Sequence, residues 1–181
     1  MEKLGFNLEK PIVLVGLMGA GKTTVGRALA KKLNIPFVDS DTEIEAAAGA
    51  SVVDIFSMYG ESEFRRAEEK VIARILDSLP AVKIVSTGEG AFITPGAREN
   101  ILENAISIWL RADLDLLVKR TSPRDTRPQL LNADSREILE KLMAQRYRIY
   151  EQADICVETA DEDLQKTLRK VIAALRKFLN S

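Results

Sequence analysis

The stretch that decides the fold is IVLVGLMGAGKT, residues 12–23. Its first four residues form an apolar run rich in β-branched side chains, which is typical of a buried strand. The next eight match G-x-x-x-x-G-K-[ST], in which glycines let the main chain curl until successive N–H groups converge on phosphate oxygens at the start of a helix. Lys22 can reach the β- and γ-phosphates, and the Thr23 hydroxyl can ligate Mg²⁺. A glycine-rich turn with an incidental lysine would need neither the strand before it nor the helix after it, so the stretch predicts a nucleotide-binding loop.

On both sides of this stretch, short apolar runs alternate with segments of helical periodicity. Strands that are apolar at every position, separated by helices, predict a parallel sheet covered on both faces. The expected strands are 12–15, 36–39, 82–86, 106–110 and 155–157, and the expected helices are 22–33, 61–79, 113–120, 135–151 and 164–179. The predicted fold class is therefore α/β, with three layers, and ligands are expected at the carboxyl ends of the strands.

The size and composition favour one domain. The chain has 181 residues and no repeat or linker-like segment, so we expect a single domain over 1–181. A net charge of −1 gives no indication of nucleic-acid or membrane binding. The N-terminal segment resembles neither a signal peptide nor a membrane span, and the single cysteine, Cys156, cannot form an internal disulfide; both features indicate the cytoplasm. We expect Cys156 and Trp109 to be buried.

Histidine is absent, so a proton acceptor must be a carboxylate, a lysine or water. Asp39 and Asp41 follow the second expected strand and can point to the same side, one toward Mg²⁺ and one toward a substrate hydroxyl. An equally good alternative is a helix N-cap, because Ser40 or Asp41 could cap a helix that starts at Thr42.

Two further patterns also have purely structural alternatives. The segment FRRAE, residues 64–68, puts Arg65 and Glu68 on one helix face, where a solvated ion pair would explain them. The segment TGEG, residues 87–90, follows the third expected strand. It could offer N–H groups to an anion or be an ordinary turn.

Together these motifs resemble the shikimate kinase family. The resemblance rests on the phosphate loop, D-x-D at 39–41, F-R-x-x-E at 64–68, the glycine turn at 88–90 and R-P at 127–128, and it extends from Ile12 to about Leu175. It implies a P-loop kinase fold with a five-stranded parallel sheet and a mobile lid at about 121–132. It also implies a monomeric enzyme that uses ATP and Mg²⁺ to phosphorylate the 3-hydroxyl of shikimate, in the route to aromatic amino acids.

The resemblance implies an acceptor site as well. Arg65 and Arg146 would clamp the carboxylate of shikimate, a task suited to the planar fork of donors on arginine. Glu68 would orient Arg65, and Asp41 would hold the ring hydroxyls and could accept the reacting proton. The pocket would also be lined by Gly88 and Gly90.

On the nucleotide side, the resemblance implies contacts from Gly19, Ala20, Gly21, Lys22, Thr23, Thr24, Arg120 and Arg127. Arg120 would pack on the adenine, and Arg127, in the lid, would reach the phosphates as charge is transferred. Thr23 would ligate Mg²⁺ directly, and Asp39 would support it through water. The implied catalytic set is Lys22, Asp41 and Arg127. Taken singly, each arginine could also be an ordinary surface charge.

The sequence departs from the family at Glu89, where the turn normally has a central glycine. A carboxylate facing an anionic substrate would weaken its binding, and a positive φ at this position would strain a glutamate. Either the side chain points away or pairs with an arginine such as Arg65 or Arg146, or the site is altered or impaired. The alternatives to a shikimate kinase are a kinase for another small polyol acid such as gluconate, and a nucleotide-binding module without catalysis.

Overall fold

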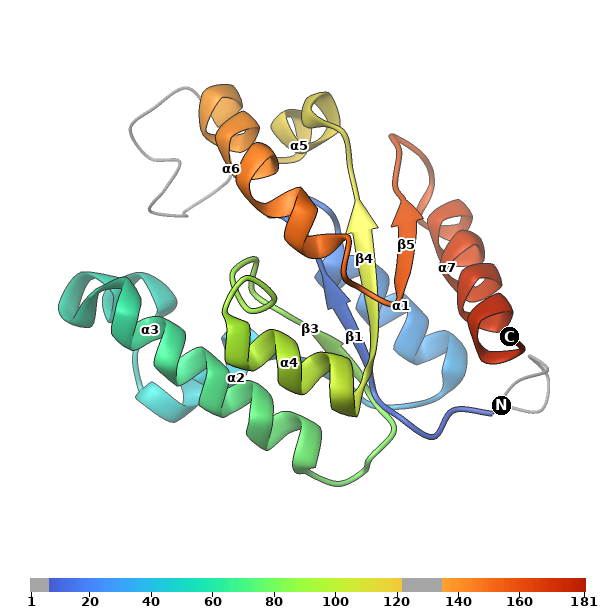
Figure 1. Ribbon diagram of the computed structural model, residues 1–181, viewed down its shortest axis with the longest axis horizontal. Coiled ribbons are helices and arrows are strands. Elements are labelled where there is room, and N and C mark those ends of the chain that lie inside the picture. Colours follow the sequence, from blue (N-terminus) through green and yellow to red (C-terminus); the bar gives the residue numbers. More distant parts are fainter. Residues whose placement is uncertain (1–6, 122–134) are drawn as a thin grey trace.

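The centre of the computed structural model, which describes residues 7–121 and 135–181, is one parallel sheet. Its strands are β1 (Ile12–Val15), β2 (Phe37–Asp39), β3 (Ile84–Ser86), β4 (Ile106–Arg111) and β5 (Ile155–Glu158), in the order β2-β3-β1-β4-β5. The predicted α/β class with a five-stranded parallel sheet is thus confirmed. β1 lies in the middle, so the glycine loop that follows it emerges at the centre of the carboxyl edge (Figure 1).

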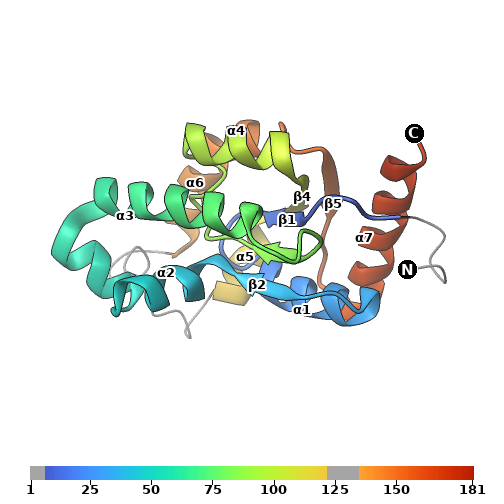
Figure 2. The ribbon, with the colours of Figure 1, turned by 90° about the horizontal axis from the view of Figure 1, so that it is seen from below.

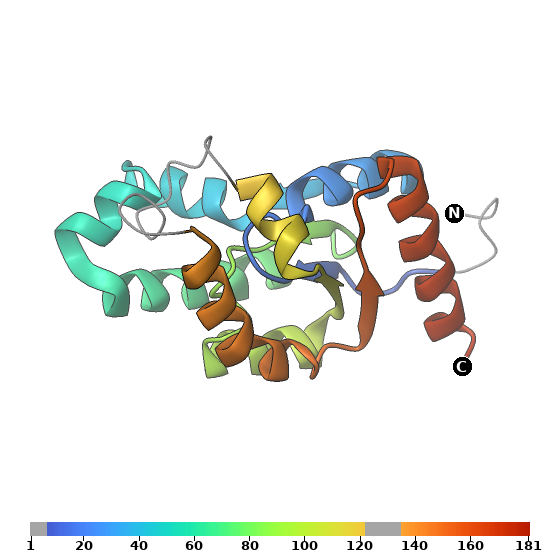
Figure 3. The same ribbon diagram turned by 90° about the horizontal axis from the view of Figure 1, so that it is seen from above.

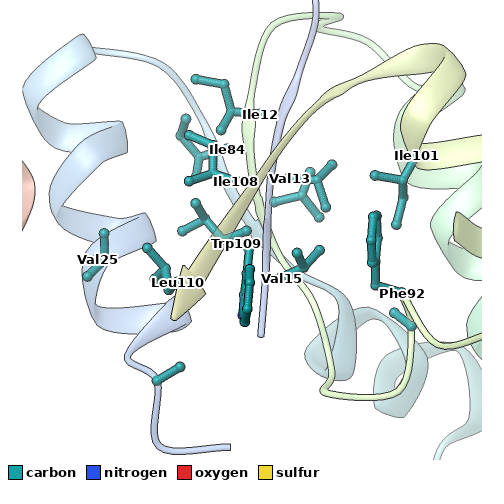
Figure 4. Packing of buried hydrophobic residues seen from close by; sticks show 14 of the residues in the cluster. Ile12, Val13, Val15, Val25, Ile84, Phe92, Ile101, Ile108, Trp109 and Leu110 are labelled. Carbon is teal, nitrogen blue, oxygen red and sulfur yellow. The ribbon is translucent and has the colours of Figure 1, made fainter. Parts of the chain in front are cut away.

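The register of the central strands divides the core between two faces. Leu14 pairs with Ile108 and Val15 with Trp109, so neighbouring side chains of the two strands share a face. Figure 4 shows Ile108 and Leu110 on the side of Val25, and Val13 and Val15 on the side of Phe92 and Ile101. Both faces are apolar because helices cover both, which is why these strands lack an alternating pattern.

Two layers of helices cover the sheet. α1 (Lys22–Leu33) and α7 (Leu164–Leu179) lie on one face, and α3 (Val52–Asp77) and α4 (Pro95–Asn104) on the other (Figures 2 and 3). α2 (Ser40–Ala48) packs against α3, whereas α5 (Leu114–Thr121) and α6 (Ser135–Tyr150) lie beyond the carboxyl ends of the strands (Figure 1). None of the helices in the described ranges is long and apolar enough to cross a membrane.

Three helices, α2, α3 and α4, differ from the expected helices by more than two residues at one end or altogether. α4 was not expected, and α2, anticipated only as the alternative helix from Thr42, starts at Ser40. Both have a weak apolar periodicity, and α4 starts at Pro95, which is favourable in a first helical turn. α3 starts at Val52 rather than at residue 61, because two helical segments join at Gly60. Gly60 has a φ of 79° and a ψ of 172°, so it interrupts the apolar periodicity and kinks the helix.

The expectation for Trp109 is confirmed and that for Cys156 is wrong. Trp109 is buried in β4, stacked on Tyr150 with ring centroids 5.9 Å apart. Cys156 is exposed on β5, which is an edge strand. Since α7 packs on β5, Ile155 and Val157 are buried, while the alternate residues point outward.

Candidate active site

The glycine loop is held in the shape that phosphate binding requires. Gly16, Gly19 and Gly21 have φ values of 139°, 79° and 95°, which residues other than glycine rarely adopt. The Lys22 side chain is buried, and its Nζ donates to the carbonyl oxygens of Gly16 at 2.8 Å and Leu17 at 3.0 Å. The lysine therefore folds back along the loop, where its charge lies beside the N terminus of α1.

A pocket of about 440 Å³ opens over this loop at the carboxyl edge of the sheet. Every predicted nucleotide-binding residue that the structure describes lines it, together with both predicted aspartates. The lining comprises Gly19–Val25, Asp39, Asp41, Thr87, Gly88, Glu89, Arg120, Thr159, Glu162, Leu164 and Thr167. One cavity thus reaches from the phosphate loop to Asp41 and Gly88, whereas the other residues expected to hold the acceptor, Arg65, Gly90 and Arg146, do not line it.

Oxygen donors gather beside the first turn of α1. The Thr23 hydroxyl donates to Asp39 Oδ2 at 3.0 Å and lies 3.1 Å from the hydroxyl oxygen of Ser86. The other carboxylate oxygen of Asp39 accepts from the backbone N–H of Asp41 at 3.2 Å. Asp39 is therefore the N-cap of α2, in place of the expected Ser40 or Asp41, and it still reaches the phosphate loop.

This donor set fits Mg²⁺. A hydroxyl and a carboxylate oxygen are hard ligands, and Mg²⁺ in phosphoryl-transfer sites usually keeps several waters and takes further ligands from phosphates. In the described ranges no cluster of three or more acidic, histidine or cysteine side chains could hold a metal by itself. Thr23 and Asp39 accordingly suit an ion that arrives with a nucleotide.

The glycine turn after β3 lies beside both Asp41 and the buried Glu68 of α3. A Cβ built on Gly88 would lie 2.7 Å from Asp41 Oδ1 and 2.8 Å from Glu68 Oε1. The Gly88 N–H donates to the hydroxyl of Ser40, which the sequence analysis did not single out as a binding residue. The absence of a side chain at Gly88 therefore allows the carboxylates of Asp41 and Glu68 to approach its backbone this closely.

Arg65 projects from α3 toward the same turn. Its Nη1 donates to Glu68 Oε2 at 2.7 Å, and its Nη2 donates to Glu61 at 3.4 Å. The guanidinium also lies over the rings of Phe64 and Phe56, at 5.1 and 5.7 Å from their centroids. The Glu68 side chain is 0% exposed and that of Arg65 is 18% exposed, so this pair is not the solvated pair of the structural alternative.

Burial changes the acidity of Glu68. Removal from water raises the pKa of its carboxyl from 4.5 to about 7, although Arg65 opposes the shift. The negative charges of Asp41 and Glu89 add to the rise. Glu68 Oε1 is buried without a hydrogen-bond partner among the described residues, in agreement with a carboxylate that is poorly solvated.

Glu89 is paired, as one of the sequence alternatives anticipated. Its Oε1 lies 3.8 Å from Nη1 of Arg146, and its backbone carbonyl accepts a hydrogen bond from the hydroxyl of Tyr150. Of the described non-glycine residues only Asn34 has a positive φ, so the expected backbone strain is absent at Glu89. Arg146 and Tyr150 are one turn apart on α6, and together they fasten that helix to the turn.

Of the two remaining predicted arginines, the structure describes Arg120 and not Arg127. Arg120 is exposed and lines the pocket, where it donates to the carbonyl oxygens of Gly19 at 3.4 Å and Ala160 at 3.0 Å. Its place between the phosphate loop and the segment after β5 suits a base-stacking residue. Arg127 and most of the expected lid, residues 122–132, lie outside the described residues.

Several pocket residues escaped the sequence analysis. Ser40 and Ser86 are buried behind the pocket, where they hydrogen-bond to the lining residues Gly88 and Thr23, and serines at strand ends carry no distinguishing pattern. Thr159 and Glu162 lie between β5 and α7, and Leu164 is the first residue of α7. The one available signal was their position after the last expected strand, since segments at the carboxyl ends of parallel strands form ligand sites.

The chain is similar to known shikimate kinases over nearly its whole length. The shikimate kinase family model matches residues 18–176. A shikimate kinase from Paramagnetospirillum magneticum is 52% identical over 98% of this chain and 90% of that protein, and one from Mesorhizobium japonicum is 46% identical over 92% and 81%. The solved structure of the Acinetobacter baumannii shikimate kinase in complex with shikimate matches with a TM-score of 0.88, at 34% identity and 93% coverage of both chains.

Proposed function

The chain belongs to the shikimate kinase family, and from this premise we propose which of its residues carry out the transfer of the γ-phosphate of ATP to shikimate. As a member of this family it is an ATP-dependent phosphotransferase that acts on a hydroxyl group and gives shikimate 3-phosphate and ADP. Relatives named shikimate kinase at 46–52% identity favour shikimate over gluconate as the acceptor.

The phosphate loop binds the triphosphate in this proposal. The N–H groups of Gly19, Ala20, Gly21, Lys22, Thr23 and Thr24 surround the phosphates at the N terminus of α1, where the helix dipole favours negative charge. The Lys22 ammonium leaves its loop carbonyls to stabilise charge on the transferred group. Arg120 packs on the adenine, and Arg127 reaches the phosphates during transfer.

Thr23 and Asp39 hold the magnesium ion, Thr23 directly and Asp39 through water. Bound there, Mg²⁺ would neutralise charge on the phosphates. The hydrogen bond from the Thr23 hydroxyl to Asp39 keeps both oxygens on the pocket side of α1 before any ligand arrives. Ser86 supports the same hydroxyl from β3.

The acceptor binds on the other side of the glycine turn. Arg65 and Arg146 take its carboxylate, Glu68 keeps Arg65 in place, and Gly88 and Gly90 leave room for the ring. Asp41 holds the reacting hydroxyl and takes its proton, because no histidine is available and Asp41 is a carboxylate that lines the pocket next to Gly88. Phosphoryl transfer depends mainly on positioning and charge stabilisation, so a weak base suffices.

One observation supports this arrangement above the others. The turn 88–90 contacts Asp41 and Glu68 at Gly88, faces Arg146 at Glu89 and lies against Arg65 at Gly90. Gly88 and Glu89 of this turn also line the pocket over the phosphate loop. Three residues therefore connect the proposed base, the two proposed carboxylate ligands and the nucleotide pocket.

A coupled assay of ADP release tests the proposal. We expect ADP to form with shikimate and Mg²⁺, at a rate far above that without acceptor or with gluconate. Arg65→Gln and Arg146→Gln should each raise the KM for shikimate while the KM for ATP stays the same. Equal rates with and without shikimate would identify a nucleotide-binding module or an ATPase instead.

We further propose that the whole chain acts as one kinase domain and as a cytoplasmic monomer that binds no nucleic acid. The single sheet and the net charge of −1 support this view. Sedimentation equilibrium of the full chain, with and without shikimate, tests the monomeric state.

A further inference from the structure

Glu89 sits at the boundary between the two halves of the proposed site. It lines the pocket over the phosphate loop, and its side chain is only 16% exposed. The hydrogen bond from Tyr150 holds its carbonyl group, and Tyr150 itself is fully buried against Phe92 and Trp109. The backbone that carries the Glu89 carboxylate is therefore fixed, and the carboxylate has little freedom to leave the neighbourhood of Arg146.

Arg65 and Arg146 each face one glutamate, but the two ion pairs differ in distance and in burial. Glu68 accepts a hydrogen bond from Arg65 at 2.7 Å and is completely buried. Glu89 lies 3.8 Å from Arg146 Nη1, which is an electrostatic contact beyond hydrogen-bond distance. That Nη1 atom is buried and has no hydrogen-bond partner in the described part of the chain. Arg146 therefore keeps a donor that a better-placed anion could satisfy.

A carboxylate on the acceptor would compete with Glu89 for that donor. Two like charges near one guanidinium repel each other, and the repulsion is strong where water is largely excluded, as at Arg146, whose side chain is 12% exposed. The influence of Glu89 extends further, since it also helps to raise the pKa of Glu68, after burial and together with Asp41. Glu89 thus acts on the whole anion-binding half of the site.

We propose that Glu89 sets the affinity for the acceptor: its carboxylate serves as the internal counter-ion of Arg146 and must yield the guanidinium when the acceptor carboxylate binds. This inference rests on the proposed function of Arg146. It makes Glu89 a residue that weakens the binding of anionic acceptors, and of the more highly charged phosphorylated product, without contributing to the transfer step.

The test compares an anionic with a neutral acceptor in Glu89→Gln, which keeps the shape of the side chain and removes its charge. Isothermal titration at low salt gives the Kd of shikimate and that of its carboxamide. We expect the Kd of shikimate to fall by about three- to tenfold in the variant, because one repulsive charge pair is removed. The Kd of the carboxamide should stay within about twofold, since a neutral group feels little of that charge.

Glu99→Gln is the matched control. It makes the same chemical change at an exposed glutamate of α4, outside the pocket lining, and the Kd of shikimate should not change. An unchanged or higher Kd of shikimate in Glu89→Gln would overturn the inference, and so would an equal change for shikimate and its carboxamide.

The failure of this inference can be told apart from the failure of the proposed function. If Arg146→Gln weakens shikimate binding and Glu89→Gln leaves it unchanged, Arg146 binds the acceptor and only the role of Glu89 is refuted. If neither Arg146→Gln nor Arg65→Gln affects shikimate binding, the proposed carboxylate site itself is wrong.

Discussion

The guanidinium of Arg65 lies directly against the backbone of Gly90. A Cβ built on Gly90 would be 2.1 Å from Nη1 and 2.2 Å from Cζ, far inside van der Waals distance. Gly90 does not have a positive φ, so the glycine is required here for space and not for backbone conformation. The guanidinium thus has both this glycine and the ring of Phe64 as close neighbours.

Replacing Gly90 by alanine should therefore displace Arg65 without straining the backbone. We expect Gly90→Ala to raise the KM for shikimate by about tenfold or more, because small displacements of a positioning group have large effects. The KM for ATP should stay the same, since the phosphate loop is not touched. Steady-state kinetics with each substrate varied in turn measures both values.

Gly96→Ala provides the comparison. A Cβ on Gly96 would also meet a side chain, 2.3 Å from Glu69 Oε1, but that atom is the end of a flexible side chain of α3 outside the proposed site. The KM for shikimate should be unaffected in this variant. Similar kinetics for the two variants would mean that Arg65 does not bind the acceptor.

Asp41→Asn should separate catalysis from nucleotide binding. Asparagine keeps the shape at the junction of Asp41 and Gly88 but cannot accept the proton of the reacting hydroxyl. We expect kcat to fall by about 100-fold or more, with the Kd for ATP within about twofold. Single-turnover kinetics and equilibrium binding give the two quantities, and normal turnover would remove Asp41 from the mechanism.

If Thr23 ligates Mg²⁺ as proposed, the response to magnesium should depend on its hydroxyl. Thr23→Ala removes the donor to Asp39 and the proposed ligand, so the Mg²⁺ concentration for half-maximal rate should rise by about tenfold. Thr23→Ser keeps the hydroxyl and should restore the wild-type value. Chelation with EDTA should abolish the activity of all three proteins. The same magnesium requirement in Thr23→Ala and wild type would refute Thr23 as a ligand.

The sequence predicted the parts of this protein whose signals are local. The phosphate loop, five strands and α1 follow from short patterns, because a strand buried on both faces and a loop rich in glycine need particular residues at neighbouring positions. The first part of α3 was not predicted, because the kink at Gly60 interrupts the helical spacing of the apolar residues. Cys156 was misplaced because burial of an edge strand depends on which helices cover it, and that is a property of the whole sheet.

The acceptor site was predicted from a family resemblance. The structure adds the contacts between its residues, which the spacing of residues along the sequence does not reveal. Arg65, Glu89 and Arg146 are far apart along the chain, and only the meeting of α3, α6 and the turn after β3 brings them together. The contact of Arg65 with Gly90 and the weak pair of Glu89 with Arg146 each depend on the detailed distance between their atoms. Such distances follow from packing, for which the sequence pattern has no direct signal.

The buried carboxyl of Glu68 should make stability depend on pH. Its pKa is raised from 4.5 to about 7 in the folded protein, so between these values the folded state holds a proton that the unfolded state has released. The free energy of unfolding contributed by this group is therefore highest below about pH 4.5 and falls as the pH rises to about 7. Glu68→Gln cannot titrate and should lack this part of the decline.

Urea unfolding without ligands at pH 5 and pH 8 measures the difference. From pH 5 to pH 8 the wild-type protein should lose roughly 2 kcal/mol more than Glu68→Gln, whatever the stability of the variant at either pH. The comparison of pH dependences matters because the glutamine also weakens the contact with Arg65 at every pH. Glu63→Gln, at an exposed residue of α3 paired with Arg66, should behave like wild type. If wild type and Glu68→Gln declined in parallel, Glu68 would be ionised in the folded protein throughout this range, and Arg65 would then outweigh the cost of burying its partner.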